Sequence, residues 1–427
     1  MAGASEITRK GRGVIMEQLR HMSEWATDHL LGKLLPFWGR LRDDEYGGFY
    51  GYVSYELQTD EKADKGCILN SRITWFFSNI YLLYKNGFLD EGKFSEYGTT
   101  PDEVLSLARH GYEFMRDKCI DKENGGIYWS VDHAGNPSDT TKHTYNQAFA
   151  IYALSSYYDA SGDKEALGLA GDLLDVVEDK CRDEIGYLEA QSRSFGPEEN
   201  DKLSENGVIA DRTMNTLLHV FESYTGYYRV TGDARTKKLL REICEVFATR
   251  IYSPELHRQN VFFDNEFRSI IDLHSYGHDI ETAWLVDKGV DIIGDEDITN
   301  MIRPMTVDLT QQIYKVAFDG RSLPAESENG VVNERRDWWV QAETVLGFVN
   351  GYLRDNNHTE YLDAAIHELD FIKEHVFDKR NGSEWFYRVD KDGNPDTTEA
   401  MVEEWKCPYH NGRMCMELIR ADRTGKL

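Results

Sequence analysis

The sequence predicts an all-α protein in which six helical hairpins close into a ring, an (α/α)6 barrel with short β-hairpins in its long loops. Two observations favour this fold class. Amphipathic segments of ordinary helix length alternate along the whole chain with short stretches rich in Gly, Asn and Asp. Two of those stretches repeat each other, which indicates a repeated helix–loop–helix unit.

About twelve segments carry apolar residues at helical spacing, which makes six hairpins. Within several pairs the link is a tight polar turn, such as Ser161–Asp163 or Thr231–Asp233, in which a helix stop stands next to an N-cap residue. Two helices that are joined by such a short turn are expected to pack antiparallel. The expected helices are 7–36, 69–88, 102–118, 143–161, 163–181, 213–231, 235–252, 277–293, 297–318, 337–355, 358–376 and 408–423.

The connections between hairpins are longer and carry the repeat. Asn124–Pro137 returns as Asn381–Pro395, and Asp44–Val53 is a third echo. Each of these stretches has a run of aromatic residues that leads to a Val and is followed by a turn. This pattern predicts a short hairpin strand before the next helix. An open solenoid fits these repeats too. We favour a closed ring, with residues 1–427 as one domain, because no segment has the polar cap of a solenoid.

Composition restricts the partners. The formal net charge of -27 disfavours binding to a phosphate backbone. No segment approaches the roughly 18 apolar residues of a membrane span, and the first residues lack the apolar run of a secretory signal. The 6 cysteines form no CxxC pair, which favours reduced thiols. We expect a cytoplasmic monomer that acts on a small molecule and binds neither nucleic acid nor membrane.

The segment His274–Trp284 concentrates two imidazoles and two carboxylates beside two aromatic residues. Gly277 is expected to separate an extended approach from a helix, on which His278 and Glu281 are neighbours at i and i+3. An imidazole held by a carboxylate is a proton carrier near neutral pH. A buried histidine with a local partner is the plainer interpretation. Polar groups in other segments argue against it.

Asn215, His219 and Glu222 share one face of a second helix, although a solvated surface would show the same pattern. Near the C-terminus, Pro408 fits the first turn of a helix whose positive end would keep His410 available as a neutral base. The alternative for His410 is a surface residue at a loop-to-helix junction.

Two further helices carry candidate ligand-binding side chains. Trp339 and Glu343 are neighbours at i and i+4, although a Trp in this position is as often part of the core. Arg72 begins a strongly apolar helix, and a cation against apolar surface needs an anionic or oxygen-rich partner.

Other chemistries fit less well. The histidines invite a zinc or manganese site, but His-Glu-x-x-His is absent and the remaining histidines lie far apart, so we expect no metal. Glycoside hydrolysis would use an acid and a base carboxylate, for which Asp279, Glu281 and Glu343 are available, but the histidines would then have no role. No phosphate loop, dinucleotide fingerprint or nucleophile elbow is present. Proton transfer on a neutral, hydroxyl-rich ligand remains.

The motifs around these residues resemble the N-acylglucosamine 2-epimerase superfamily, and within it the cellobiose 2-epimerases. The resemblance covers nearly the whole chain, and Ser223, where the family pattern has Ala, is a small departure. The motifs are NSRITWFFS from Asn70, GGIYWSVDHAGNPSDTTKHTYNQAFAIYALS from Gly125, SENG, the segment Thr213–Tyr224, HSYGHDIETAWL from His274, WWVQAE from Trp338 and WKCPYHNGRMCME from Trp405.

The resemblance implies an (α/α)6 barrel and a reversible, cofactor-free epimerisation at C2 of the reducing-end glucose of β-1,4-linked disaccharides such as cellobiose, lactose and mannobiose. It implies that His278 and His410 are the acid/base pair, and that Glu281 orients His278. His219 would assist ring opening and Arg72 would bind O1 and O2. The implied substrate contacts are Tyr145, Asn215, Trp339, Glu343 and Trp405.

The residue chemistry agrees with that implication. Inversion of a carbon next to a carbonyl requires ring opening, removal of the C2 proton on one face and its return on the other, which suits two imidazoles. A cation such as Arg72 would stabilise the enediolate oxygens. The open alternatives are epimerisation of N-acetylglucosamine, isomerisation of mannose, a metal-dependent isomerase, an inverting glycosidase and a sugar-binding protein without turnover.

Overall fold

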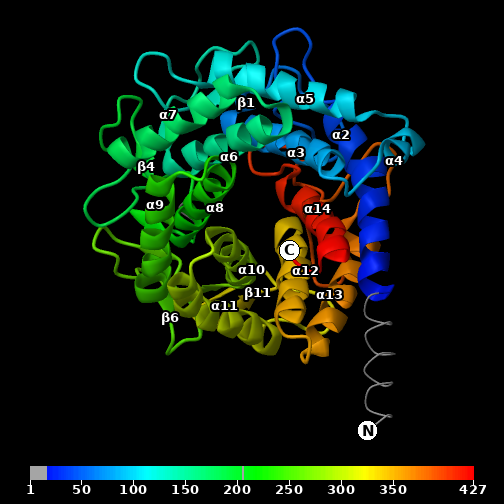
Figure 1. Ribbon diagram of the computed structural model, residues 1–427, viewed down its shortest axis with the longest axis vertical. Helices are drawn as coiled ribbons and strands as arrows, with labels where there is room; N and C mark the ends of the chain where they lie inside the picture. Colours follow the sequence, from blue (N-terminus) through cyan, green and yellow to red (C-terminus); the bar gives the residue numbers. More distant parts are fainter. Residues whose placement is uncertain (1–16, 204–205) are drawn as a thin grey trace.

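The computed structural model describes residues 17–203 and 206–427. Its helices form two concentric rings around one axis (Figure 1). Within the described residues, six helices form the inner ring, and each contacts the next until α14 contacts α3 and closes the circle. The inner helices are α3 (Cys67–Lys85), α6 (Thr144–Ser161), α8 (Met214–Thr231), α10 (Tyr276–Ile293), α12 (Trp338–Arg354) and α14 (Tyr409–Thr424).

The outer ring packs against the inner one, and four of its helices end or continue in a π-helical turn. Its members are the helix over 17–29 with η1 (Leu30–Leu34) and α2 (Leu35–Gly39), α5 (Pro101–Phe114) with η2 (Met115–Cys119), α7 (Lys164–Lys180), α9 (Ala234–Val246) with η3 (Phe247–Ile251), α11 (Glu296–Val316), and α13 (Thr359–Phe371) with η4 (Ile372–Val376). A short helix, α4 (Glu91–Glu96), lies between α3 and α5.

The turns between inner and outer helices have the chemistry that their sequence predicts. α6 ends at Gly162, whose φ of 78° is in the left-handed region, and Asp163 then caps α7 by accepting a hydrogen bond from the backbone of Glu165. Gly232 and Asp233 repeat this arrangement between α8 and α9. The helices of each pair are therefore antiparallel, and the inner helices begin at the same end of the ring.

The long loops gather at that end. Hairpins in five of them are closed by bridges between residues six positions apart, namely Val53 with Thr59, Val131 with Pro137, Gln191 with Pro197, Phe263 with Ser269 and Val389 with Pro395. The strands are β1 (Lys65–Gly66), β2 (Ser130–Val131), β3 (Lys142–His143), β4 (Ala190–Gln191), β5 (Arg212–Thr213), β6 (Tyr252–Ser253), β7 (Arg258–Gln259), β8 (Phe262–Phe263), β9 (Leu273–Ser275), β10 (Glu326–Glu328), β11 (Val331–Asn333), β12 (Arg336–Asp337) and β13 (Arg388–Val389).

These strands join each loop to its neighbour around the ring. β2 pairs with β1, which precedes α3, and β4 pairs with β3, which precedes α6. The pattern continues with β8 on β5, β10 on β9 and β13 on β12. A bridge between Val53 and Val402 connects the first loop with the last one. The starts of the inner helices are thereby held in one frame.

Buried ion pairs strengthen that frame. A cation with almost no exposed surface stands just before five of the inner helices and pairs with a carboxylate from an earlier part of the same loop. Because a buried charge is costly without a partner, each pair fixes its loop against the start of a helix. The pairs are Lys65 with Asp43, Lys142 with Asp121, Arg212 with Asp183, Arg336 with Asp319 and Lys406 with Glu384.

The closed ring is confirmed and the open solenoid is wrong, because α14 packs against α3. The expected helices are found with bounds that agree to within a few residues, except that α4 was not predicted and that the expected segment 7–16 lies outside the described residues. The expected hairpins at 124–137 and 381–395 are also present. Among the described residues, no helix is long and apolar enough to cross a membrane.

Candidate active site

The site lies where the inner helices begin, and equivalent positions of different helices supply its polar groups. The sixth residue of four inner helices is Arg72, His219, Glu281 or Glu343. Because the loop frame aligns the helix starts, these side chains converge on the axis. A cavity there is lined by Arg72, Tyr145, Lys202, Leu203, Asn215, His219, His278, Glu281, Trp338, Trp339, Tyr387, Trp405 and His410.

Trp339 brings the two predicted acid/base histidines together. Its ring centroid lies 4.7 Å from that of His278 and 5.5 Å from that of His410. Gly277 explains the close approach, since a Cβ on this residue would lie 2.6 Å from the Trp339 ring. The expected change from an extended approach to a helix is present, with β9 ending at Ser275 and α10 beginning at Tyr276, one residue before Gly277.

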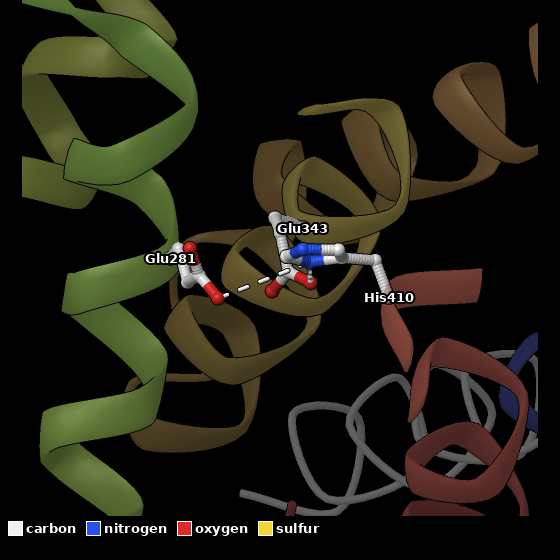
Figure 2. Close-up of side chains that lie close together, drawn as sticks. All are labelled: Glu281, Glu343 and His410. Carbon is white, nitrogen blue, oxygen red and sulfur yellow. Dashed lines mark hydrogen bonds and ion pairs between the residues drawn. The ribbon is translucent and has the colours of Figure 1, made fainter. Parts of the chain in front are cut away.

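His410 is held by a buried carboxylate. Its Nδ1 lies 2.7 Å from Oε1 of Glu343, and the other oxygen of Glu343 accepts a hydrogen bond of 2.9 Å from Nε1 of Trp284. Figure 2 shows Glu281 and Glu343 reaching the same point from α10 and α12, with His410 beside them. Glu343 therefore stands behind the cavity wall and contacts the ligand space through His410.

His219 is held in the same way. Its Nδ1 lies 2.9 Å from Oε2 of Glu222, one turn further along α8. Glu222 also accepts hydrogen bonds from Tyr409 and Arg413 of α14. His219, Glu222 and Asn215 were expected on one helix face, and the alternative of a solvated surface is wrong for His219 and Glu222, which are both buried.

His278 has a different partner from the one expected. Its Nδ1 lies 2.7 Å from Oγ of Ser275, the residue that precedes α10. Glu281, which was expected to orient His278, accepts a hydrogen bond from Arg413 instead. The adjacent His274 does not line the cavity, and its Nε2 lies 2.8 Å from Oδ2 of Asp279. Glu281 lines the same cavity as His278, as the helical spacing predicted, but the buried guanidinium of Arg413 binds its carboxylate.

Arg72 meets aromatic rings and a phenol. Nη2 donates a hydrogen bond of 2.7 Å to the hydroxyl of Tyr145, and the guanidinium carbon lies 4.1 Å from the ring centroid of Phe149. Among the described residues, no carboxylate forms an ion pair with Arg72. Arg72 is only 2% exposed. Its unpaired positive charge is therefore available for an oxygen-rich ligand in the cavity.

Burial favours the neutral form of His278 and His410. It lowers the pKa of His278 to about 3, with a smaller effect from His219. Burial and then Arg413 lower the pKa of His410 well below its usual value. Burial would raise the pKa of Glu222, but Arg413 and the hydrogen bond from His219 hold it at about 2. The pKa of Glu281 is raised to about 7, by burial and by Glu343.

One group of side chains has the spacing of metal ligands. Donor atoms of Glu281, Glu343 and His410 lie within 4.8 Å of one another. However, Nη2 of Arg413 donates to both carboxylates, with 2.8 Å to Oε1 of Glu343, so a cation of the protein already occupies the point that they share. The guanidinium therefore takes the place between these ligands that a metal ion would need.

The sequence model of the N-acylglucosamine 2-epimerase (GlcNAc 2-epimerase) family matches residues 47–411. The chain belongs to this family. Cellobiose 2-epimerase of Eubacterium cellulosolvens is 48% identical over 415 residues, covering 93% of this chain and 98% of the relative.

Solved structures agree in fold. The crystal structure of a sugar epimerase from a ruminal bacterium has a TM-score of 0.88 and 45% identity, over 93% of this chain and 98% of that one. Cellobiose 2-epimerase from Bacillus thermoamylovorans B4167 has a TM-score of 0.86 and 39% identity, over 94% and 99%. The predicted membership of the epimerase family and the predicted barrel are both confirmed.

The structure brings the predicted site residues of this family member into one place. Nine of the ten line the cavity, and Glu343 is bonded to His410 behind it. The sequence interpretation missed Lys202, Leu203, Trp338 and Tyr387 in the wall, and Ser275, Tyr409 and Arg413 among the hydrogen-bond partners. An arginine three residues after His410, inside an otherwise buried helix, was the available signal for Arg413.

Proposed function

We propose that this chain is a cellobiose 2-epimerase, an isomerase that interconverts reducing-end glucose and mannose in β-1,4-linked disaccharides. The observation that carries the proposal is the pair of imidazoles, His278 and His410, flanking Trp339 in one cavity. In both, Nδ1 is engaged by a neighbouring group, which leaves Nε2 for the substrate. Relatives named cellobiose 2-epimerase, which share nearly the full chain, support the same activity.

The reaction begins with ring opening. His219, held by Glu222, exchanges a proton with the ring and anomeric oxygens so that C1 becomes an aldehyde. Arg72 and Tyr145 bind O1 and O2 and thereby fix the open chain in a cis arrangement. Trp339 and Trp405 offer apolar faces to the sugar, and Asn215 offers an amide.

Proton transfer at C2 follows. One imidazole removes the C2 proton, and the electron pair of that bond forms a C1–C2 double bond while negative charge moves to O1. Arg72 stabilises the resulting enediolate. The second imidazole, which has taken a proton from water before this step and is an imidazolium, delivers that proton to the opposite face of C2. The aldehyde re-forms and the ring closes, and the two histidines have exchanged their protonation states. Atoms balance because one proton is lost and one is gained.

We further propose that residues 1–427 form a single catalytic domain that acts in the cytoplasm as a monomer without a metal or other cofactor. Arg72 and Arg413 supply the positive charge that a metal would otherwise provide at this site. Light scattering of the purified protein tests the monomer. Undiminished turnover after exhaustive chelation supports the cofactor-free reaction, and activity restored only by zinc or manganese contradicts it.

The activity is tested with cellobiose in deuterated water. We expect a mannose-terminated product that carries deuterium at C2. Parallel assays with N-acetylglucosamine and mannose separate the related activities, and released monosaccharides would indicate a glycosidase. Binding of cellobiose without product or deuterium incorporation would overturn the proposal.

A further inference from the structure

Arg413 lies beneath the cavity and bonds to three carboxylates from three other inner helices. Nη1 donates a hydrogen bond of 2.7 Å to Oε1 of Glu222, and Nη2 donates to Glu281 and, over 2.8 Å, to Glu343. Its guanidinium carbon lies 4.8 Å from the ring centroid of Trp284 and 4.3 Å from that of Tyr409. Arg413 is 1% exposed and does not line the cavity.

Two of these carboxylates hold histidines. Glu222 accepts from Nδ1 of His219 and Glu343 from Nδ1 of His410, so one continuous chain of contacts connects the two imidazoles through Arg413. An ionised carboxylate is only an acceptor, and it therefore requires a proton on Nδ1. In a neutral imidazole, Nε2 is then without a proton and can act as a base towards the cavity.

We infer that Arg413 is a positioning residue that holds His219 and His410 in the Nδ1–H tautomer by keeping Glu222 and Glu343 ionised. The inference rests on the proposed function for its effect on turnover, but the tautomer itself is a property of the free protein. Nothing in the proposed reaction requires Arg413 to touch the sugar.

Charge and geometry explain why an arginine is needed. Three carboxylates buried around one point cannot all stay ionised without a cation, because like charges at short range favour protonation of one of them. A protonated carboxyl can donate to Nδ1, which moves the imidazole proton to Nε2 and removes the base. The planar fork of a guanidinium reaches Glu222 with one nitrogen and Glu281 and Glu343 with the other, a geometry that a single ammonium lacks.

The first test is nitrogen-15 NMR of histidine-labelled enzyme without substrate. We expect Nδ1–H signals for His219 and His410 in the wild type and their loss, with gain of Nε2–H, in Arg413→Met. Glu222→Gln should change only His219, which keeps the inference testable where Arg413→Met fails to fold. Arg420→Met, on the same helix, should change neither signal. Retention of both Nδ1–H signals in Arg413→Met would overturn the inference.

The second test is the pH profile of turnover. Without Arg413 the carboxylates take up protons at higher pH, so the acid limb of kcat should move up by about one pH unit or more. At neutral pH we expect kcat to fall about 100-fold with a small change in KM. Arg413→Lys should restore part of the acid limb, because it restores the charge. An unshifted acid limb in Arg413→Met would show that Arg413 has a merely structural role and would contradict the inference.

The two tests also distinguish failure of the proposed function from failure of this inference. If the wild-type enzyme is inactive on cellobiose but Arg413→Met shows both NMR changes, only the proposed function has failed.

Discussion

The imidazole of His278 is held by a hydroxyl, whereas those of His219 and His410 are held by carboxylates. A carboxylate stabilises an imidazolium more strongly than a hydroxyl does. The two histidines beside Trp339 therefore have different hydrogen-bond partners, although burial lowers the pKa of both. This difference affects how readily each histidine donates a proton. Single substitutions can measure the contribution of each histidine.

Replacement of either His278 or His410 by Ala should lower the rate of epimerisation by about 100-fold or more, since one of two proton carriers is lost. Exchange at C2 should survive in each variant only for the epimer whose C2 proton faces the remaining imidazole. Mass spectrometry of cellobiose and of its mannose-terminated epimer, each incubated in deuterated water, measures this. Equal exchange of both epimers by both variants would contradict two bases on opposite faces.

Ser275→Ala removes the hydrogen-bond partner of His278 Nδ1 and leaves the imidazole free to rotate. We expect kcat to fall roughly tenfold, because the lost contact orients the base and is worth about one neutral hydrogen bond. Ser275→Thr keeps the hydroxyl and is the matched control. Steady-state kinetics with both variants measure the effect, and a wild-type kcat in Ser275→Ala would show that the hydroxyl has no such role.

At the scale of elements, close packing of α10 against α12 sets the distance between His278 and Trp339. Gly277 of α10 touches Trp339, and Gly347 of α12 faces Ile280, whose Cγ1 would lie 2.3 Å from an added Cβ. Helix propensity alone would favour Ala at both positions. The glycines are therefore explained by the approach of two helices and not by their local conformation.

Gly347→Ala should lower the free energy of unfolding by about 1–3 kcal/mol, because the inserted methyl group overpacks the interface. Gly277→Ala should also raise KM, since it displaces the ring of Trp339 in the cavity wall. Gly168→Ala in α7, where an added Cβ meets no atom within 4 Å, is the control and should stabilise by about 0.5–1 kcal/mol. Urea unfolding and steady-state kinetics test both effects, and a stable Gly347→Ala protein would show that Ile280 yields.

At the scale of the whole molecule, opposite ends of the ring are held by different buried charges. The loop end contains the cation–carboxylate pairs that precede the inner helices. At the other end, Glu417 of α14 pairs with Lys288 over 2.5 Å and with Arg420 over 2.6 Å. Such pairs make the stability of the closed ring depend on pH.

Burial would raise the pKa of Glu417, but Lys288 and Arg420 hold it at about 2, below its usual value of 4.5. A lowered folded-state pKa contributes stability that is present above the unfolded pKa and is lost as pH falls through the folded pKa. Between pH 7 and pH 3.5, Glu417→Gln should therefore lose about 1 kcal/mol less unfolding free energy than the wild type. Urea titrations at both pH values measure this, with the exposed Glu266→Gln as control. Equal losses in all three proteins would contradict the prediction.

The sequence by itself determined the helices and favoured the closed ring, because apolar periodicity and capping turns are local signals. It placed His278, His410, His219 and Arg72 in one site through motifs that carry this chemistry. Only the tertiary structure decided which groups hold them. Arg413 meets partners 70 to 191 residues away, and its guanidinium takes Glu281 from His278, which Ser275 then holds. Such a competition depends on distances between helices, and spacing along one helix does not contain them.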